Sequence, residues 1–346
     1  MSLEELLLEA PDSSQMLMKQ KLGYVQSNGT ISLRRKIADL YSGATPDHIL
    51  VTNGTSEANY LVTWNLTEPD DEVLLMLPNY MQIWGISRAF RGTIRPFHLR
   101  EETGWRVDFD ELERAVSPRT RLIAVCNPNN PTGAILSEEE MQRIVEVARN
   151  ANAWLLADEV YQGAERDGKL TGSFWGRYEK TIITAGLSKA YGLPGLRIGW
   201  IAGEPDLIAK LWSYHDYLTI GPGMLSDVLA QIALTPSVRG NILGRTRKIL
   251  QTNYPVLAEW IRNHGDLFSL VEPKAGAIAY VRYNLPVNST QLVEKLLHEK
   301  SVLIVPGDHF GMDHYLRIGY GEPANFLHAA LDRIHDTLAS LKTQNP

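Results

Sequence analysis

Cysteine is almost absent from this chain, because Cys126 is the only one among 346 residues. A single thiol cannot form a disulfide within the chain, nor supply a zinc or iron–sulfur centre that needs several cysteines. No apolar run reaches the roughly 18 residues that span a membrane. The amino end, residues 1–5, is acidic and polar, unlike a secretory signal. These absences predict a cytoplasmic protein without a membrane segment.

Positive charge is also scarce: 34 Lys and Arg stand against 40 Asp and Glu, a net charge of −6. Nucleic acids and acidic membranes attract concentrated positive charge, so neither is predicted as a main partner. The composition, 44% hydrophobic and 21% charged, is that of an ordinary globular protein. The length favours two domains.

Short apolar runs recur along the first part of the chain, and each ends in a polar turn that leads into a helical stretch. These runs are 49–51, 73–77, 122–126, 154–157, 181–185 and 198–202. Runs of this kind suit strands buried on both faces of a parallel sheet covered by helices. Later, short strands near 277–281, 302–305 and 315–318 mix with helices near 289–299 and 323–341. The pattern predicts an α/β protein with a mainly parallel central sheet, plus a smaller α+β domain.

Polar residues follow five of these strands: Gly54–Ser56, Tyr80, Asn130, Asp158 and Lys189. In an open parallel sheet, ligands bind at the carboxyl ends of the strands. Five separate turns could therefore supply one pocket.

The stretch 187–199 holds Ser188, Lys189 and, eight residues after the lysine, Arg197. Two surface cations on a loop are one interpretation. The other is a lysine that loses its proton readily beside a second cation and a desolvated pocket, and so attacks a carbonyl as a Schiff-base lysine.

Gly54, Thr55 and Ser56 follow a strand and open a helix. Backbone N–H groups, two hydroxyls and the helix dipole suit such a turn to binding an anion. A simple helix N-cap is the alternative. The spacing fits neither a P-loop nor a dinucleotide-binding turn.

Five further positions carry polar or aromatic groups that suit a ligand site. Asp158, with Tyr161 three residues on, could pair with a protonated ring nitrogen or cap a helix. Asn130 lies in a proline-held turn and could simply form an Asx turn. Tyr80 could stack on a flat ring or fill the core. Arg317, within an apolar run, could clamp a carboxylate or lie on the surface.

The cluster Asp308, His309, Asp313 and His314 contains metal-ligating residue types. No ligand geometry can be read from this loop, and we predict no metal site.

Together these residues resemble a known family. In chain order the motifs are Gly54-Thr55-Ser56, Asn130-Pro131-Thr132-Gly133, Asp158 with Tyr161, Ser188-Lys189 and Arg197. They resemble the fold-type I pyridoxal-phosphate (PLP) enzymes of the aspartate aminotransferase family, in class I and II. The resemblance runs from Tyr24 to Arg317 and implies PLP as cofactor, an amino acid and a 2-oxo acid as substrates, and a homodimer with shared active sites.

The resemblance also implies roles for single residues. Lys189 would bind the cofactor as a Schiff base and shuttle the proton of the substrate carbon. Asp158 would keep the pyridine nitrogen protonated. Asn130 and Tyr161 would bond the ring hydroxyl oxygen, and Tyr80 would stack on the ring.

Other residues would hold the phosphate and the substrate. The implied phosphate ligands are Gly54, Thr55, Ser56 and Arg197, with Ser188 also placed among the cofactor-binding residues. Arg317, together with Asn130, would bind the substrate carboxylate, and Tyr24 would reach the phosphate of the neighbouring subunit. The expected domains are an amino-terminal arm at 1–23 that joins the small domain, a large PLP-binding domain at 24–235 and a small domain at 236–346.

Three departures from the family pattern stand out. Gly186 replaces a frequent phosphate-binding serine, and only 23 residues precede Tyr24, so the usual lid would be short, trimmed or replaced. Enzymes for acidic amino acids carry a cation in the phosphate turn or in the partner loop. Here the turn has Ser56, and the stretch 215–222 has no Lys or Arg. Aspartate and glutamate are therefore not expected as preferred substrates, and Asp216 would favour a basic or polar side chain.

The leading hypothesis is a PLP-dependent aminotransferase. A PLP-dependent cyclase, lyase or oxidase is the alternative, because the run 77–85 looks like the branch that includes capreomycidine synthase. A ligand-sensing module of a DNA-binding regulator is less supported, since no basic helix-turn-helix segment precedes residue 24.

Overall fold

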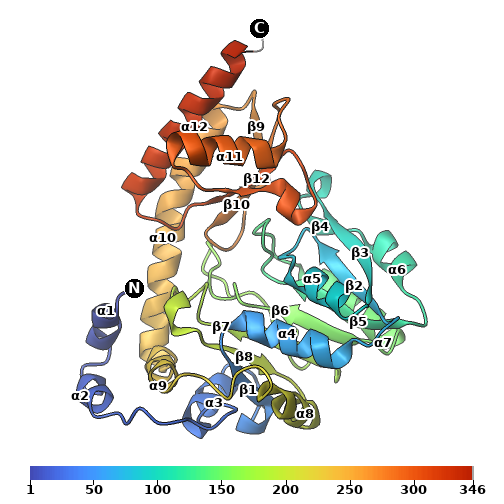
Figure 1. Cartoon of the computed structure of the whole chain (residues 1–346), viewed down its shortest axis with the longest axis vertical. Coiled ribbons are helices and arrows are strands. Elements are labelled where there is room, and N and C mark those ends of the chain that lie inside the picture. The colour runs from blue at the N-terminus through green and yellow to red at the C-terminus, as the bar shows by residue number, and fades with distance from the viewer. Residues whose placement is uncertain (345–346) are drawn as a thin grey trace.

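The computed structural model describes residues 1–344. A large sheet surrounded by helices forms one part and a small sheet with its own helices forms the other, while the helix α10 (Pro236–Asn263) runs alongside both (Figure 1). At about 1.5 Å per residue, a helix of 28 residues is roughly 40 Å long, enough to reach from one part to the other.

The large sheet has eight strands in the order β1-β8-β7-β6-β5-β2-β3-β4. Their bounds are β1 (Ile49–Thr52), β2 (Glu72–Leu77), β3 (Thr93–Arg100), β4 (Arg106–Val107), β5 (Thr120–Cys126), β6 (Trp154–Asp158), β7 (Thr181–Gly186) and β8 (Gly199–Ala202). Strands β7, β6, β5, β2 and β3 are parallel to their neighbours in that series, whereas β8 is antiparallel to β1 and β7, and β4 to β3. The predicted fold class, with a mainly parallel central sheet, is confirmed.

Two apolar cores cover the two faces of this sheet. Alternate residues of a strand point to opposite faces: in β2, Val73 and Leu75 pack in one core, and Leu74 and Met76 in the other. The helices around the sheet are α3 (Ile31–Ala38), α4 (Thr55–Leu66), α5 (Gln82–Ala89), α6 (Phe109–Ala115), α7 (Glu138–Asn150), α8 (Pro205–His215) and α9 (Met224–Ala233). Because both faces are buried, the strands read as continuous apolar runs.

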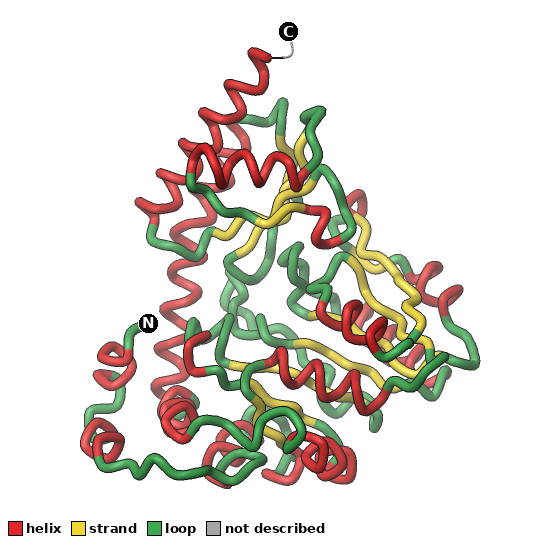
Figure 2. Tube along the Cα trace, in the orientation of Figure 1, coloured by secondary structure: helices red, strands yellow, loops and turns green. Residues whose placement is uncertain are grey.

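The small sheet is antiparallel, with the order β11-β12-β10-β9. Its elements are β9 (Phe268–Leu270), β10 (Ile278–Tyr283), α11 (Ser289–Lys300), β11 (Val305–Pro306), β12 (Tyr315–Gly319) and α12 (Ala324–Gln344). Loops gather between this sheet and the carboxyl ends of the large sheet's parallel strands (Figure 2). The two sheets thus face each other across these loops.

The amino-terminal arm contains α1 (Leu3–Leu8) and α2 (Ser13–Met18). It lies beside the lower end of α10 and near α9 (Figure 1), where Asn241 Nδ2 donates to Glu9 at 2.6 Å. The domain boundaries at 23 and 235, and the assignment of the arm to the small domain, stay a proposal.

Some elements differ from the sequence expectations. Strand β3 was not predicted, because its residues alternate between exposed and half-buried positions near the edge of the sheet. The strand predicted at 302–305 is observed only at Val305–Pro306. No helix within residues 1–344 is long and apolar enough to cross a membrane.

Candidate active site

A cavity of about 280 Å³ opens at the carboxyl ends of the parallel strands. It is lined by Thr55, Ser56, Asn59, Tyr80, Cys126, Asn130, Asp158, Val160, Tyr161, Ser188, Lys189, Pro194, Arg197 and Arg317. The structure therefore brings together all but two of the site residues predicted from sequence. Gly54 lies directly behind the lining, and Tyr24 lies elsewhere on the surface, 86% exposed.

The turn before α4 is shaped for an anion. Gly54 has φ +85°, and a Cβ atom there would collide with the guanidinium of Arg197. Arg197 in turn donates through Nη2 to the Asn53 carbonyl at 3.2 Å. Thr55 and Ser56 are the first two helical residues, whose N–H groups have no carbonyl within the helix to bond. Three kinds of hydrogen-bond donor therefore converge here: two backbone amides, two hydroxyls and the guanidinium. The helix dipole adds a favourable field for an anion.

The hydroxyl of Thr55 is buried and has no hydrogen-bond partner. Buried polar atoms are normally paired, and an orphan calls for an explanation. A phosphate oxygen in this turn would supply the missing partner.

Asp158 ends β6 at the floor of the cavity and is almost fully buried. Its Oδ2 accepts from Asn59 Nδ2 at 3.1 Å, and its Oδ1 accepts from the Val160 N–H at 3.1 Å. Burial raises the pKa of this carboxyl, while these bonds and the nearby Lys189 oppose the shift. A cationic ring nitrogen would donate a further hydrogen bond to this carboxylate and balance its buried charge.

Lys189 projects from the turn after β7 and remains accessible from the mouth of the cavity. Partial burial lowers the pKa of its ammonium group; Arg317 and Arg197 add repulsion, and Asp158 opposes them. These surroundings favour the neutral amine, the form that attacks a carbonyl and accepts a proton.

Arg317 reaches the cavity from β12 in the small sheet. Its Nη1 donates to Asn130 Oδ1 at 2.9 Å, across the gap between the two sheets. The guanidinium has further N–H groups that can donate to a carboxylate. Tyr161 is buried beside it, and burial raises the pKa of its hydroxyl, which therefore stays protonated and able to donate.

Two lining residues with polar side-chain atoms, Asn59 and Cys126, were not predicted from the sequence as site residues. Asn59 lies one helical turn after Thr55, on the same face of α4, and its Oδ1 accepts from Thr184 Oγ1 at 2.8 Å. That bond fixes which way the amide of Asn59 points, so that its Nδ2 faces Asp158. The spacing of four residues from Thr55 was the available signal. Cys126 also lines the cavity, but burial raises the pKa of its thiol and makes it a poor nucleophile.

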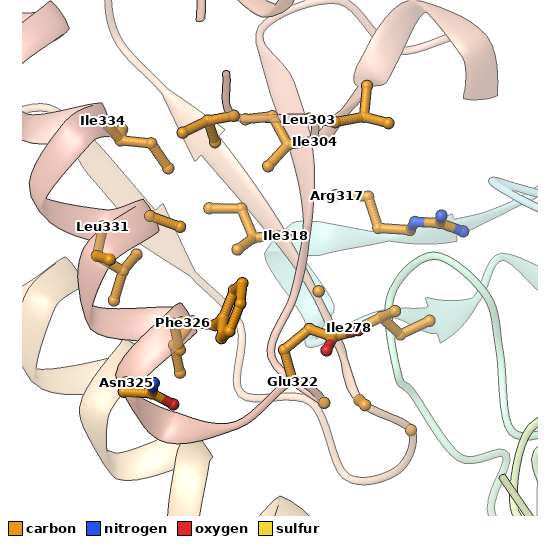
Figure 3. A pocket seen from close by; sticks show the side chains of 18 of the residues that line it. Ile278, Leu303, Ile304, Arg317, Ile318, Glu322, Asn325, Phe326, Leu331 and Ile334 are labelled. Carbon is orange, nitrogen blue, oxygen red and sulfur yellow. The ribbon is translucent and has the colours of Figure 1, made fainter. Parts of the chain in front are cut away.

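A larger cavity of about 910 Å³ adjoins the first and shares Tyr161, Ser188, Lys189 and Arg317 with it. Its far wall is apolar and includes Phe326, Leu331 and Ile334 from α12 (Figure 3). Arg317 points away from that wall in the figure. This opening leaves Lys189 accessible to a small molecule from solvent.

Asp308 and Asp313, the two acidic residues of the cluster considered for a metal site, accept hydrogen bonds from the first residues of α11. Asp313 Oδ1 accepts from the Ser289 N–H at 2.8 Å, and Asp308 Oδ2 accepts from Thr290 Oγ1 at 2.8 Å. Within residues 1–344, no group of three or more candidate side chains is arranged to hold a metal ion.

The fold and this set of side chains define an enzyme built for a cofactor that carries an aldehyde, a basic ring nitrogen and a phosphate. Comparison with known proteins identifies the family: the sequence pattern of aminotransferase class I and II matches residues 2–334. The chain belongs to this family, whose cofactor is pyridoxal 5′-phosphate, and it is a PLP-dependent enzyme of fold type I.

Three similar proteins illustrate the range of the family. Capreomycidine synthase of Streptomyces vinaceus is 32% identical over 296 residues, which cover 85% of this chain and 76% of the relative. The crystal structure of a PLP-dependent aminotransferase from Streptococcus suis 89-1591 is 33% identical, with a TM-score of 0.92, and the match covers 99% of this chain and 91% of the other. The PLP-dependent cyclase OrfR is 26% identical, with a TM-score of 0.90, covering 98% and 90%.

The residues present fit PLP. The orphaned Thr55 hydroxyl and the donors around it suit the phosphate, the buried Asp158 suits a protonated ring nitrogen, and Lys189 lines the same cavity.

Proposed function

We propose that the protein is an aminotransferase that moves an amino group from an amino acid to a 2-oxo acid, with Lys189 as the residue that binds the cofactor aldehyde. The observation that carries this proposal is one cavity that joins Lys189 to a buried carboxylate, Asp158, and to a carboxylate-binding arginine, Arg317. Asp158 ends β6, Lys189 lies in the turn after β7 and Arg317 lies in β12, so the fold itself brings them together.

Bound PLP supplies an electron sink that stabilises negative charge at the substrate carbon. Asp158 would hold the proton on the ring nitrogen, and Asn59 would keep Asp158 in the required orientation. Lys189, with its lowered pKa, takes the proton from the substrate carbon and returns it. Arg317 fixes the substrate carboxylate and so orients the carbon toward the lysine.

Side-chain preference follows from the cations that line the cavity. Among the described lining residues these are Lys189, Arg197 and Arg317. The first two serve the cofactor and the third serves the α-carboxylate, which leaves none for a second carboxylate. Ser56 lies in the phosphate turn, and the stretch 215–222 contains no Lys or Arg. We therefore propose that acidic amino acids are poor donors and that a polar or basic side chain is preferred.

Cyclisation, elimination or oxidation of an amino acid on the same cofactor is the second candidate. It is favoured by the 32% identity to capreomycidine synthase and by the likeness to the cyclase OrfR. Both candidates need the same Lys189, Asp158 and Arg317 and differ only in the fate of the substrate after its proton is removed.

We also propose a homodimer in which Tyr24 acts on the site of a second copy. Tyr24, Tyr217 and Ile220 are strongly exposed. The loop that carries Tyr24 contacts α8, the helix that leads to Tyr217 and Ile220. In this contact Trp212 Nε1 of α8 donates to Ser27 Oγ at 2.8 Å. Such an apolar surface beside the phosphate turn suits a second copy of the chain.

The test is the visible spectrum of the PLP-loaded protein while single amino acids are added without a 2-oxo acid. Transamination predicts complete loss of the cofactor's Schiff-base absorption, with one 2-oxo acid released per cofactor. Aspartate should react at least roughly tenfold more slowly than the best donor. The variant Lys189→Ala should not become labelled with cofactor on borohydride reduction.

Persistence of the absorption, with a cyclised or eliminated product detected by mass spectrometry, would favour the second candidate. If wild-type protein and Lys189→Ala were labelled equally, the assignment of Lys189 would be wrong.

A further inference from the structure

A largely buried acidic side chain, Glu57, lies in the first turn of α4, next to the proposed phosphate-binding turn. Glu57 Oε2 accepts from the Asn53 N–H at 2.5 Å, and its Oε1 accepts from Thr219 Oγ1 at 2.6 Å. His215, the last residue of α8, places its Nε2 3.3 Å from Glu57 Oε2. An acidic group so close to a phosphate site needs an explanation, because like charges repel.

His215 is fully buried, and both of its ring nitrogens face oxygen acceptors. Nε2 faces Glu57 and also lies 3.3 Å from Thr219 Oγ1, whose own proton is donated to Glu57, and Nδ1 lies 3.1 Å from the Ser27 carbonyl oxygen. Only a ring with a proton on each nitrogen donates to both acceptors. In that form His215 carries a positive charge that offsets the charge of Glu57.

The same network holds the residue before Gly54 from several sides. The Asn53 N–H is bound by Glu57, and its carbonyl accepts from Arg197 Nη2. The Asn53 side chain donates through Nδ2 to Thr219 Oγ1 at 2.8 Å. The peptide that enters the phosphate turn is therefore fixed between Glu57 on one side and the phosphate-binding arginine on the other.

Hydrogen bonding keeps Glu57 ionised. Burial raises the pKa of its carboxyl, but bonds from His215, Thr219 and the Asn53 N–H outweigh burial and leave the pKa below its ordinary value. A permanent negative charge therefore lies one turn into the helix whose N-terminus would hold the phosphate.

We propose that Glu57 and His215 are positioning residues of the phosphate turn. Glu57 holds the Asn53 peptide so that the Thr55 and Ser56 amides stay free, and His215 neutralises Glu57 so that the pair does not repel the phosphate. This rests on the proposed assignment of the turn to the cofactor phosphate. Neither residue lines the cavity, so both act through Asn53.

The pair also links the turn to two distant segments. Thr219 belongs to the exposed loop after α8, and Ser27 to the loop before α3. The pair therefore connects the phosphate turn to the segments that carry Tyr217 and Tyr24.

The experiment compares the affinity of the cofactor-free, full-length protein for PLP and for pyridoxal, which lacks the phosphate. Both aldehydes can react with Lys189, so their ratio isolates the phosphate contribution. His215→Gln leaves Glu57 without a counter-charge, and we expect PLP to bind roughly tenfold more weakly while pyridoxal changes less than about twofold. The double variant Glu57→Gln/His215→Gln removes both charges, and we expect PLP affinity within about threefold of wild type.

Controls separate the proposal from general loss of structure. His298→Gln, on the exposed face of α11, should leave both affinities unchanged. If His215→Gln does not fold, Thr219→Val tests the same network through its exposed loop and should weaken PLP binding about threefold without affecting pyridoxal.

Each outcome is decisive. Equal losses for PLP and pyridoxal would overturn the positioning role, and a double variant weaker than His215→Gln alone would overturn the role of His215 as the counter-charge of Glu57. If wild-type protein formed no Schiff base with either aldehyde, the proposed function would fail first, and this inference with it.

Discussion

Glu159, next to Asp158, should make the stability of the cofactor-free protein fall as the pH rises. Its side chain is buried, and its carboxylate accepts from the Phe174 N–H at 2.8 Å and from Ser173 Oγ at 2.8 and 3.0 Å. Burial is the main cause that raises the pKa of this carboxyl, from an ordinary 4.5 to about 7, and the negative charge of Asp158 adds to it. The hydrogen bonds oppose the shift but do not cancel it.

The sign and size of the effect follow from linkage between ionisation and folding. Because the pKa is higher in the folded protein, the contribution of Glu159 to stability is fully present below pH 4.5 and is lost as the pH rises through about 7. Each pH unit in that interval corresponds to about 1.4 kcal/mol, so the complete loss is roughly 3 kcal/mol. Glu159→Gln keeps the acceptor for Phe174 and cannot ionise.

The assay is urea unfolding of the cofactor-free wild type and of Glu159→Gln, from about pH 4.5 to about pH 8. The variant should gain roughly 3 kcal/mol relative to wild type across this range. Glu139→Gln, an exposed change on α7, should show no such trend. A difference between wild type and Glu159→Gln that stays constant with pH would refute the reasoning.

Two further predictions concern the phosphate turn and the floor of the cavity. Asn59→Leu removes a hydrogen bond to Asp158 and should lower the free energy of unfolding by roughly 1–3 kcal/mol, measured in urea, and weaken PLP binding. Gly54→Ala places a Cβ against Arg197 and should weaken PLP binding at least roughly tenfold in equilibrium titrations. Gly43→Ala, also at positive φ but in open space, should destabilise the fold without that loss of affinity.

Much of the fold could be predicted from the sequence because the sheet is buried on both faces. Continuous apolar runs mark the central strands, and the turn after each strand falls at the same edge of a parallel sheet. That rule alone places Asp158 and Lys189 in one cavity. It gives no help with β3, whose mixed polarity reflects partial exposure.

Contacts that depend on how elements dock could not be predicted in the same way. Asn59 reaches Asp158 only because α4 packs over β6 and β7 in one particular rotation. The Arg317–Asn130 bond joins residues 187 positions apart, one in β12 and the other in the turn after β5. No local spacing encodes such a contact: the apolar run around Arg317 left open whether it lies on the surface or binds a carboxylate, and the resemblance to a family favoured the second.

Gly186 illustrates how a departure from the family pattern acquires a physical reason. The serine frequent at this position would add a hydroxyl to the phosphate site, but a Cβ on Gly186 would lie 2.7 Å from Thr55 Oγ1. The space is therefore already occupied by a hydroxyl, and that hydroxyl is buried without a partner. We infer that Thr55 supplies from α4 the contact that a serine would supply from β7.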